Sequence, residues 1–270
     1  MTEKENSGIR LEIIDKAGFR KAWTEDKERA VLAFEGIYEE GDVIRLSVPQ
    51  TNCHYIVRID DTMDEALVFL TEFTITFIVP FGEKKKSYNP KSFSGERHYL
   101  TCRKAEAFEW NIYRNLAKNV MDQHGENGCY PHASANVETR GESVFAARNA
   151  IDGIVANTSH GSWPFESWGI NRREDAEMLL EFGEPVDIDK IILWTRADFP
   201  HDNWWEEATL EFSDGSQEVL NMEKQQKPHV FPIVKTKITW IKMKEMKKAD
   251  DPSPFPALTQ IEVYGKPASP

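Results

Sequence analysis

Cysteine is scarce in this chain of 270 residues, which has only Cys53, Cys102 and Cys129. An odd and widely spaced set does not make a disulfide framework, so disulfide bonds are not expected to hold the fold together. No two of the three have the CxxC spacing of a structural zinc site, which argues against such a site. We interpret all three as buried free thiols.

Positive charge and long apolar runs are lacking as well. The formal net charge is −12, and a surface of that sign suits neither nucleic acid nor an anionic membrane, since both attract cationic proteins. Two short basic runs, at 84–86 and 242–248, are interpreted as a solvated loop or an edge strand. No apolar stretch approaches the length of a membrane span. We therefore expect no nucleic-acid partner and no membrane partner.

The first ten residues, MTEKENSGIR, have no apolar segment of the kind that signal peptides carry. As written, the chain is therefore expected in the cytoplasm, and an extracellular location stays open if a leader has been removed. Common catalytic motifs are also absent, with no GxSxG, HExxH, P-loop or GxGxxG pattern. A binding protein is therefore favoured over an enzyme, although spacing alone never excludes a catalytic triad. Nothing in the sequence indicates the oligomeric state.

What the first hundred residues do contain is short segments of alternating polar and apolar residues, separated by turn signals. Such alternation is typical of strands with one buried face. Strands are predicted at 30–37, 43–48, 55–59, 66–70, 73–79 and 98–103. Their regular spacing predicts a small β-sandwich over residues 1–104.

The apolar period changes after residue 104. Phe108, Ile112, Leu116 and Val120 recur at helical steps, which predicts an amphipathic helix over 105–121. We expect this helix, in a linking segment 105–127, to pack its apolar stripe on one or both of the flanking β regions. No Ser/Gly-rich or Pro-rich linker occurs, which favours docked domains.

Strand patterns resume at residue 128. The Ser-Asp-Gly-Ser sequence at 213–216 is a strong hairpin signal. Strands are predicted at 177–182, 188–195, 208–212, 218–222, 230–234, 237–243 and 258–264. This even spacing is typical of a jelly-roll. The predicted fold class is therefore all-β with one linking helix, made of two β-sandwich domains, the second of which covers 128–270.

Five motifs in this second half occur in a recognisable order. They are HASA at 132–135, NAIDG at 149–153 followed by Asn157, Thr158 and a tryptophan, IDKI at 188–191, LEFSDG at 210–215 and IEVYG at 261–265. Together they resemble the discoidin, or coagulation-factor-type, superfamily, which includes the family 32 carbohydrate-binding modules. The resemblance covers about 128–266 and implies a galactose-binding-like jelly-roll that binds carbohydrate without catalysis.

The resemblance also implies a structural calcium ion at the loop around Asp152. Calcium takes six to eight oxygen ligands, from carboxylates, hydroxyls, amides and carbonyls. The side chains expected to supply them are Asp152, Asn157, Thr158, Gln260 and Glu262. Alternatively, Asp152 accepts hydrogen bonds from its own loop in an Asx turn and holds no ion.

Two long loops, at 160–168 and 195–205, are rich in aromatic and polar residues. A sugar presents an apolar C–H face and a rim of hydroxyl groups, so its site needs an aromatic plate together with fixed donors and acceptors. Trp163, Trp168, Trp204 and Trp205 are the candidate plates. The candidate polar ligands are His160, Arg196, Asp198, His201, Asp202 and Asn203.

Core packing is the alternative interpretation of these tryptophans. Trp194 lies within an apolar strand and is expected in the core. Of the adjacent pair Trp204 and Trp205, one is expected to face inward and the other outward, since a strand alternates. The Pro-rich loop 250–256 either forms one wall of the pocket or is a rigid crossover.

The sequence thus favours a non-catalytic carbohydrate-binding protein. The first alternative is a carbohydrate-active enzyme, a glycoside hydrolase or lyase that uses Asp198, His201 or Asp202, because hydrolysis needs two carboxyl groups close together. The second is a protein–protein interaction module with exposed aromatic residues.

Overall fold

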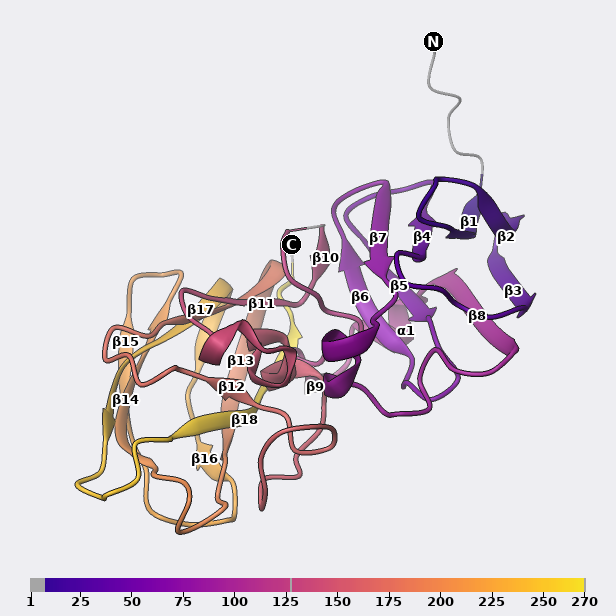
Figure 1. The fold of residues 1–270 in the computed structure, drawn as a ribbon. Helices are drawn as coiled ribbons and strands as arrows, with labels where there is room; N and C mark the ends of the chain where they lie inside the picture. Colours follow the sequence, from indigo (N-terminus) through magenta and orange to yellow (C-terminus); the bar gives the residue numbers. More distant parts are fainter. Residues whose placement is uncertain (1–7, 127, 270) are drawn as a thin grey trace.

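The structure, a computed structural model, describes residues 8–126 and 128–269. The ribbon forms two β-rich bodies, with strands β1 to β8 in one and strands β11 to β18 in the other (Figure 1). Buried apolar residues separate in the same way into an N-terminal core and a C-terminal core. The predicted all-β fold class is confirmed, and the domain limits at 104 and 127 stay predictions.

Two antiparallel sheets enclose the N-terminal core, one with the order β2-β1-β4-β7 and the other with the order β10-β6-β5-β8-β3. β3 (Arg29–Glu35) buries every second residue, as a strand with one face on a core does. All the segments predicted as strands between 30 and 103 are strands. The remaining members are β1 (Ile9–Ile14), β2 (Arg20–Asp26), β4 (Val43–Ser47), β5 (Cys53–Arg58), β6 (Ala66–Leu70), β7 (Thr74–Ile78), β8 (Arg97–Lys104) and β10 (Cys129–Tyr130), with the 3-10 helix η1 at Gly82–Ser87.

The predicted helix over 105–121 is wrong. Only one helical turn forms, α1 (Ala107–Trp110), and the chain then becomes extended in β9 (Arg114–Asn115). Part of the predicted apolar stripe faces solvent, since Phe108 is 76% exposed. The apolar residues of this segment thus recur with a helical period, although only the turn 107–110 is helical.

Pairing with a strand edge explains why the helix does not continue. β9 pairs with β18 (Ala257–Pro267). The backbone N–H of Leu116 donates to the carbonyl of Val263 at 2.7 Å, and the side chain of Asn115 accepts from the N–H of Val263 at 3.0 Å. These bonds satisfy backbone groups that a helix would bond internally, so tertiary contact overrides the local pattern.

The linking segment contacts both cores, as predicted for its apolar residues. Leu116 and Ala117 belong to the C-terminal core, whereas Val120 and Met121 belong to the N-terminal core. The junction also contains an ion pair between His54 and Glu184, whose Nε2 and Oε1 atoms are 2.7 Å apart.

The C-terminal core is enclosed by one curled sheet with the order β12-β18-β13-β17-β14-β15, to which β9, β11 and β16 add at its sides. All the strands predicted from 177 onward are present, and the segments 177–182 and 188–195 merge into β13. The members are β11 (His132–Ala135), β12 (Trp168–Gly169), β13 (Met178–Thr195), β14 (Trp205–Phe212), β15 (Gln217–Asn221), β16 (His229–Phe231) and β17 (Lys235–Lys248), with 3-10 helices η2 (Thr139–Gly141), η3 (Ser143–Phe145) and η4 (Ala147–Ile151).

The long strand β13 changes partners midway. Its first residues pair with β11 and β17, and its last residues pair with β18 and β16. Gly183 has φ +75, and a Cβ there would lie 2.5 Å from the Tyr130 ring, so this position favours glycine. Because the register also shifts between Glu181 and Val186, the sheet bends here and its two halves face one core.

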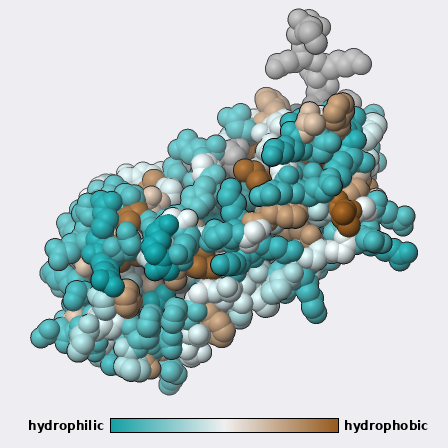
Figure 2. All heavy atoms as spheres, in the orientation of Figure 1, coloured by the Kyte–Doolittle hydropathy of each residue, from teal (hydrophilic) through white to brown (hydrophobic). Residues whose placement is uncertain are grey.

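The face drawn in Figure 2 is mainly hydrophilic, with hydrophobic residues in small separate groups. Among the residues that the structure describes, no helix combines the length and the apolar character needed to cross a bilayer.

Gly265 offers a direct test of the packing between β13 and β18. A Cβ at this position would lie 2.0 Å from the carbonyl oxygen of Asp187 and 2.8 Å from the Cα of Ile188, and both are backbone atoms. We expect Gly265→Ala to lower the free energy of unfolding by about 2–4 kcal/mol, measured by denaturant titration followed by tryptophan fluorescence. The neighbouring exposed substitution Lys266→Ala should leave it unchanged, and equal midpoints for the two variants would contradict the packing.

Candidate functional site

Three loops of the C-terminal body meet around a pocket of about 440 Å³. They are the β13–β14 loop, the β17–β18 loop and the loop before β12 that contains His160. The side chain of Asn203 donates to the carbonyls of Ala249 and Ser253, and the hydroxyl of Ser253 donates to the carbonyl of His201, so the first two loops are tied together. The pocket is lined by Thr139, Arg140, Phe145, His160, Gly169, Ile170, Asn171, Arg172, Arg196, His201, Pro254, Phe255, Pro256 and Ala257.

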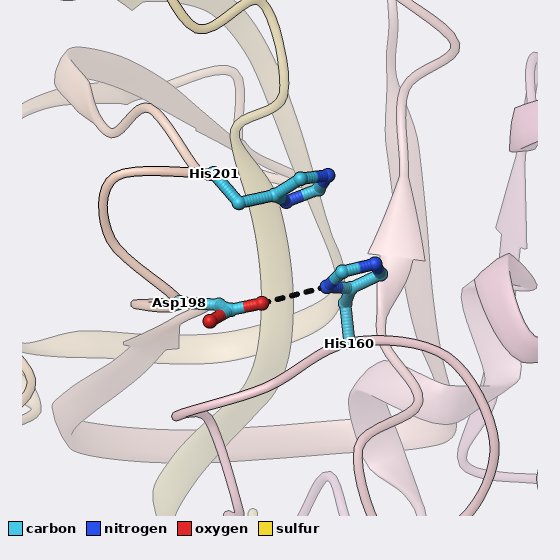
Figure 3. A group of neighbouring side chains, drawn as sticks. All are labelled: His160, Asp198 and His201. Atoms are coloured by element: carbon cyan, nitrogen blue, oxygen red, sulfur yellow. Dashed lines mark hydrogen bonds and ion pairs between the residues drawn. The ribbon is translucent and has the colours of Figure 1, made fainter.

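One wall of this pocket contains a stack of planar side chains. The rings of His160 and His201 are parallel to within 4°, with centroids 4.1 Å apart (Figure 3). On the other side of His201 the Phe255 ring is also stacked, at 5.2 Å and 10°. Each ring supports the next, which limits the rotation of both imidazoles.

Carboxylates orient both histidines through the same ring atom. His160 Nδ1 is 2.7 Å from Asp198 Oδ2, and His201 Nδ1 is 3.0 Å from Asp202 Oδ1. A carboxylate accepts a proton, so these contacts place the proton of each neutral ring on Nδ1. The Nε2 atoms of both rings have no hydrogen-bond partner within the described residues, and they are the atoms available to a ligand.

The buried ion pair between Arg196 and Asp202 lies behind the stack. Their side chains are 5% and 0% exposed, and Nε and Nη2 of the guanidinium donate to the carboxylate at 2.7–3.0 Å. Asp202 also accepts from the backbone N–H of Asp198 at 2.8 Å, and Arg196 donates to the carbonyl of Phe255 at 3.3 Å. The pair therefore sets the conformation of two of the three loops.

The three side chains in Figure 3 could at first suggest a metal centre, since ligand atoms of His160, Asp198 and His201 all lie within 4.8 Å of one another. An imidazole binds a metal along the lone pair that lies in its ring plane. Two parallel stacked planes do not meet, so an ion in the plane of one ring lies well outside the plane of the other. As placed, this cluster suits hydrogen bonding to an organic ligand.

Of the predicted polar ligands, His160, His201 and Arg196 line the pocket, and Asp198 holds His160. Asp202 and Asn203 are both fully buried and act on the loops behind the pocket wall. Loop residues from separate parts of the chain thus do come together as expected, and their roles toward a ligand stay predictions.

The predicted tryptophan plates are not in this pocket. Trp168 and Trp205 are both 0% exposed, so the prediction that they offer a ring face is wrong. Trp163 lies at the junction of the two bodies, where its backbone N–H donates to the backbone carbonyl of Lys86 at 2.8 Å. Trp204 is half-buried and packs edge-on against Phe199. The pair Trp204 and Trp205 does divide into an outer and an inner residue, as alternation predicts.

Trp194 was expected in the core, and this is wrong. It is half-buried, and its Nε1 donates to Glu262 Oε1 at 2.8 Å. An apolar strand sequence does not reveal that one face of β13 is only partly covered.

Several pocket residues were missed by the sequence analysis. Arg140, Phe145, Asn171 and Arg172 come from segments without a motif. The Pro-rich loop was one of the two options for a wall, and Pro254, Phe255 and Pro256 do line the pocket. The others lie in segments that carry no motif, although Asn171 and Arg172 follow the recognised loop 160–168 by only three and four positions.

The Asp152 loop has the features of an Asx turn. Asp152 Oδ1 accepts from the N–H of Ile154 at 2.8 Å, and Gln260 Oε1 accepts from the N–H of Gly153 at 3.1 Å. Both carboxylate oxygens of Glu262 accept hydrogen bonds, from Trp194 and Tyr264. Thr158 is exposed, and the amide of Asn157 donates to backbone carbonyls. Asp152 and Gln260 therefore meet, while Glu262 bonds to other side chains.

Glu166, which the sequence analysis did not single out, lies beside Asp152. It is 1% exposed, and neither carboxylate oxygen has a hydrogen-bond partner among the described residues. Burial and the nearby charge of Asp152 raise the pKa of Glu166 to about 9, and burial raises the pKa of Asp152 to about 6. The buried guanidinium of Arg148 acts on both carboxyl groups and lowers their pKa in part, and a shared proton or a bound cation would relieve the pair further.

Comparisons with known proteins give structural likenesses only. No family model and no curated protein matches the chain. The similar solved structures include a chitosan-binding module of a chitosanase/glucanase from Paenibacillus sp. IK-5, at 16% identity over 56% of this chain and 98% of the module, with a TM-score of 0.39.

Two family 32 carbohydrate-binding modules from Clostridium perfringens are similar as well. One, solved with GlcNAc-α-1,4-galactose, has 16% identity over 60% of this chain and 97% of its own, with a TM-score of 0.39. The other, from NanJ and solved with galactose, has 17% identity over 49% of this chain and 91% of its own, with a TM-score of 0.36. They are modules of the kind that the five sequence motifs resemble. The chemistry of the pocket has to be argued from its own geometry.

The buried carboxyl pair predicts a pH dependence of stability. Because the folded-state pKa of Glu166 is raised above the ordinary value, the unfolded chain loses this proton first, and stability falls as pH rises from about 4.5 toward 9. In EDTA at about pH 8 we expect Glu166→Gln to raise the free energy of unfolding by about 1–3 kcal/mol. Near pH 4 the difference should disappear.

Denaturant titrations at the two pH values measure this effect, with the exposed substitution Glu206→Gln as the control. If Glu166→Gln is less stable than the wild type at about pH 8, the ionised Glu166 does not destabilise the fold, and the prediction is wrong.

Proposed function

We propose that the pocket binds a carbohydrate and does not catalyse its cleavage. The observation that carries the proposal is that the lining combines two kinds of group. Ile170, Pro254, Phe255, Pro256 and Ala257 are apolar, and the imidazole Nε2 atoms and the guanidinium of Arg196 are polar. A sugar ring presents both an apolar C–H face and a hydroxyl rim, so it can contact both kinds of group.

Pre-arrangement of the polar groups supports the proposal. The stack and the two carboxylates hold both imidazoles before a ligand arrives, so little side-chain freedom is lost on binding. The Nη1 atom of Arg196 donates to no group within the described residues, while its other nitrogens are held by Asp202. A ligand hydroxyl can therefore accept from a guanidinium that is already fixed.

Absence of carboxyl groups from the lining argues against the enzyme alternative. Hydrolysis of a glycosidic bond needs a carboxylic acid and a carboxylate on opposite sides of the bond. No Asp or Glu lines this pocket among the described residues, and Asp202 is fully buried in its ion pair. Asp198 reaches only the edge of the site, where it holds His160.

Isothermal titration with a panel of neutral and charged glycosides tests the proposal. His201→Ala removes one fixed Nε2 acceptor and the centre of the stack, so we expect at least tenfold weaker binding, or about 1.4 kcal/mol. Trp204→Ala should change the affinity less than twofold, because Trp204 does not line the pocket. Thermal melts of both variants check that they fold.

Two results would overturn the proposal. One is that no glycoside of the panel binds the wild type. The other is that Trp204→Ala abolishes binding while His201→Ala does not, which would mean that the sugar binds at Trp204 and not in this pocket.

A structural calcium ion at the Asp152 loop is a second part of the proposal. Asp152, Glu166 and the amide oxygen of Gln260 offer oxygen ligands at the base of the loop, and two neighbouring buried carboxylates favour a divalent cation. The ion would stiffen the loop that leads to His160 and would take no part in ligand chemistry.

Thermal and denaturant unfolding with calcium or with EDTA test this second part. At about pH 8 and a calcium concentration 100 times the Kd, binding adds about 2.7 kcal/mol to the free energy of unfolding. We expect this gain in the wild type, and a much smaller one in Glu166→Gln and in Asp152→Asn. Magnesium, which demands a tighter octahedral shell, is the control ion. Identical unfolding in calcium and EDTA would rule the ion out.

A further inference from the structure

We infer that the pocket selects sugars that carry an anionic group, a carboxylate or a sulfate, and that Arg172 is the residue that recognises it. This inference rests on the proposed carbohydrate-binding function and names the chemical class of its ligand. It begins from the charge of the lining. Three arginines and two histidines line the pocket, and no Asp or Glu does so among the described residues, although the chain as a whole has a net charge of −12.

The three guanidinium groups differ in how far their charge is already neutralised. Arg196 is paired with Asp202 in the interior, and Arg140 is paired with Glu142 at the surface through two hydrogen bonds of 2.5 and 2.7 Å. Arg172 makes no ion pair with any described carboxylate. Its guanidinium carbon lies 4.7 Å from the centroid of the Phe255 ring. Arg172 is therefore the cation that remains for a ligand.

A tight turn fixes the position of Arg172. Asn171 and Arg172 have φ of +49 and +61, as the two central residues of a type I′ turn do, and asparagine is favoured at the first of them. The N–H of Arg173 donates to the carbonyl of Ile170 at 3.0 Å, which closes the turn, and the N–H of Asn171 donates to the hydroxyl of Thr139 at 2.9 Å, which anchors it.

Arg172 also lines two adjacent pockets. A second pocket, of about 540 Å³, shares Ile170, Arg172, Pro254 and Pro256 with the first. The second pocket is lined by Glu174, Glu245 and Asp250 as well as by basic residues, so the excess of positive charge belongs to the first pocket. An acidic group on a sugar in the first pocket can reach the Arg172 side chain at this junction.

A guanidinium in this setting suits an anion better than a hydroxyl. Its planar fork of N–H donors matches the oxygens of a carboxylate or sulfate and forms charge-assisted hydrogen bonds. The competing explanation is that Arg172 only packs on Phe255 through a cation–π contact. The two explanations predict different responses to ligand charge.

The experiment uses two series of matched ligands, and the members of each series differ only at C6. They are the methyl glycosides of galactose and glucose, the corresponding uronic acids and the corresponding 6-sulfates, titrated against the full chain by calorimetry. We expect at least one anionic member to bind about five- to tenfold more tightly than its neutral parent at low salt. Added salt should reduce this preference, since screening weakens the interaction of exposed charges.

Arg172→Gln should remove the preference, so that the neutral and the anionic glycosides bind the variant with equal affinity. The adjacent Arg173→Gln is the matched control, because Arg173 is already paired with Asp175 and does not line the first pocket. Arg172→Lys, which keeps the charge but not the fork, should retain part of the preference.

Two outcomes would overturn the inference while the proposed function stands. One is that the wild type binds neutral and anionic members equally. The other is that Arg172→Gln weakens both by the same factor, which indicates packing on Phe255 alone. If no neutral or anionic glycoside binds at all, the proposed function itself is wrong.

Discussion

The site depends on one interaction, the buried ion pair between Arg196 and Asp202. Breaking a buried pair by removing one partner costs about 3–5 kcal/mol, because the remaining charge is left without compensation. This carboxylate also binds His201 and the backbone of Asp198, and this guanidinium binds the carbonyl of Phe255. The order of the pocket is thus derived from a buried pair, of which Arg196 lines the pocket and Asp202 lies behind its wall.

A second constraint joins the two bodies of the molecule. The loop from Asp152 to Trp163 starts beside the buried Glu166 and ends on the backbone of Lys86. The segment after β8 packs on both cores and adds to the edge of β18. His160 lies on this loop, so the position of one pocket residue depends on contacts with the N-terminal body.

The outcome for the predicted helix shows where sequence patterns fail. Alternation predicts both strands correctly, because β3 has one face on a core and one in solvent, and β14 buries Ala208, Leu210 and Phe212 on its core face. The period at 105–121 suggests a helix equally well, yet its backbone finds partners on β18 that lie about 150 residues away in sequence. The hydrophobic period of a segment carries no information about partners that are so far away in the sequence. The same limit explains the tryptophans, since an aromatic-rich loop does not tell which rings a neighbouring strand will cover.

Sequence alone determined the all-β class, the positions of most strands along the chain and the two loops that contain His160, Arg196 and His201. It did so because these features depend on local alternation, turn residues and ordered motifs. Only the tertiary structure decided that Trp168 and Trp205 are buried, that Phe255 stacks on His201 and that Arg172 faces the same pocket. Those facts depend on contacts between segments far apart in the chain, and the energy of each contact exists only once the sheet has curled around its core.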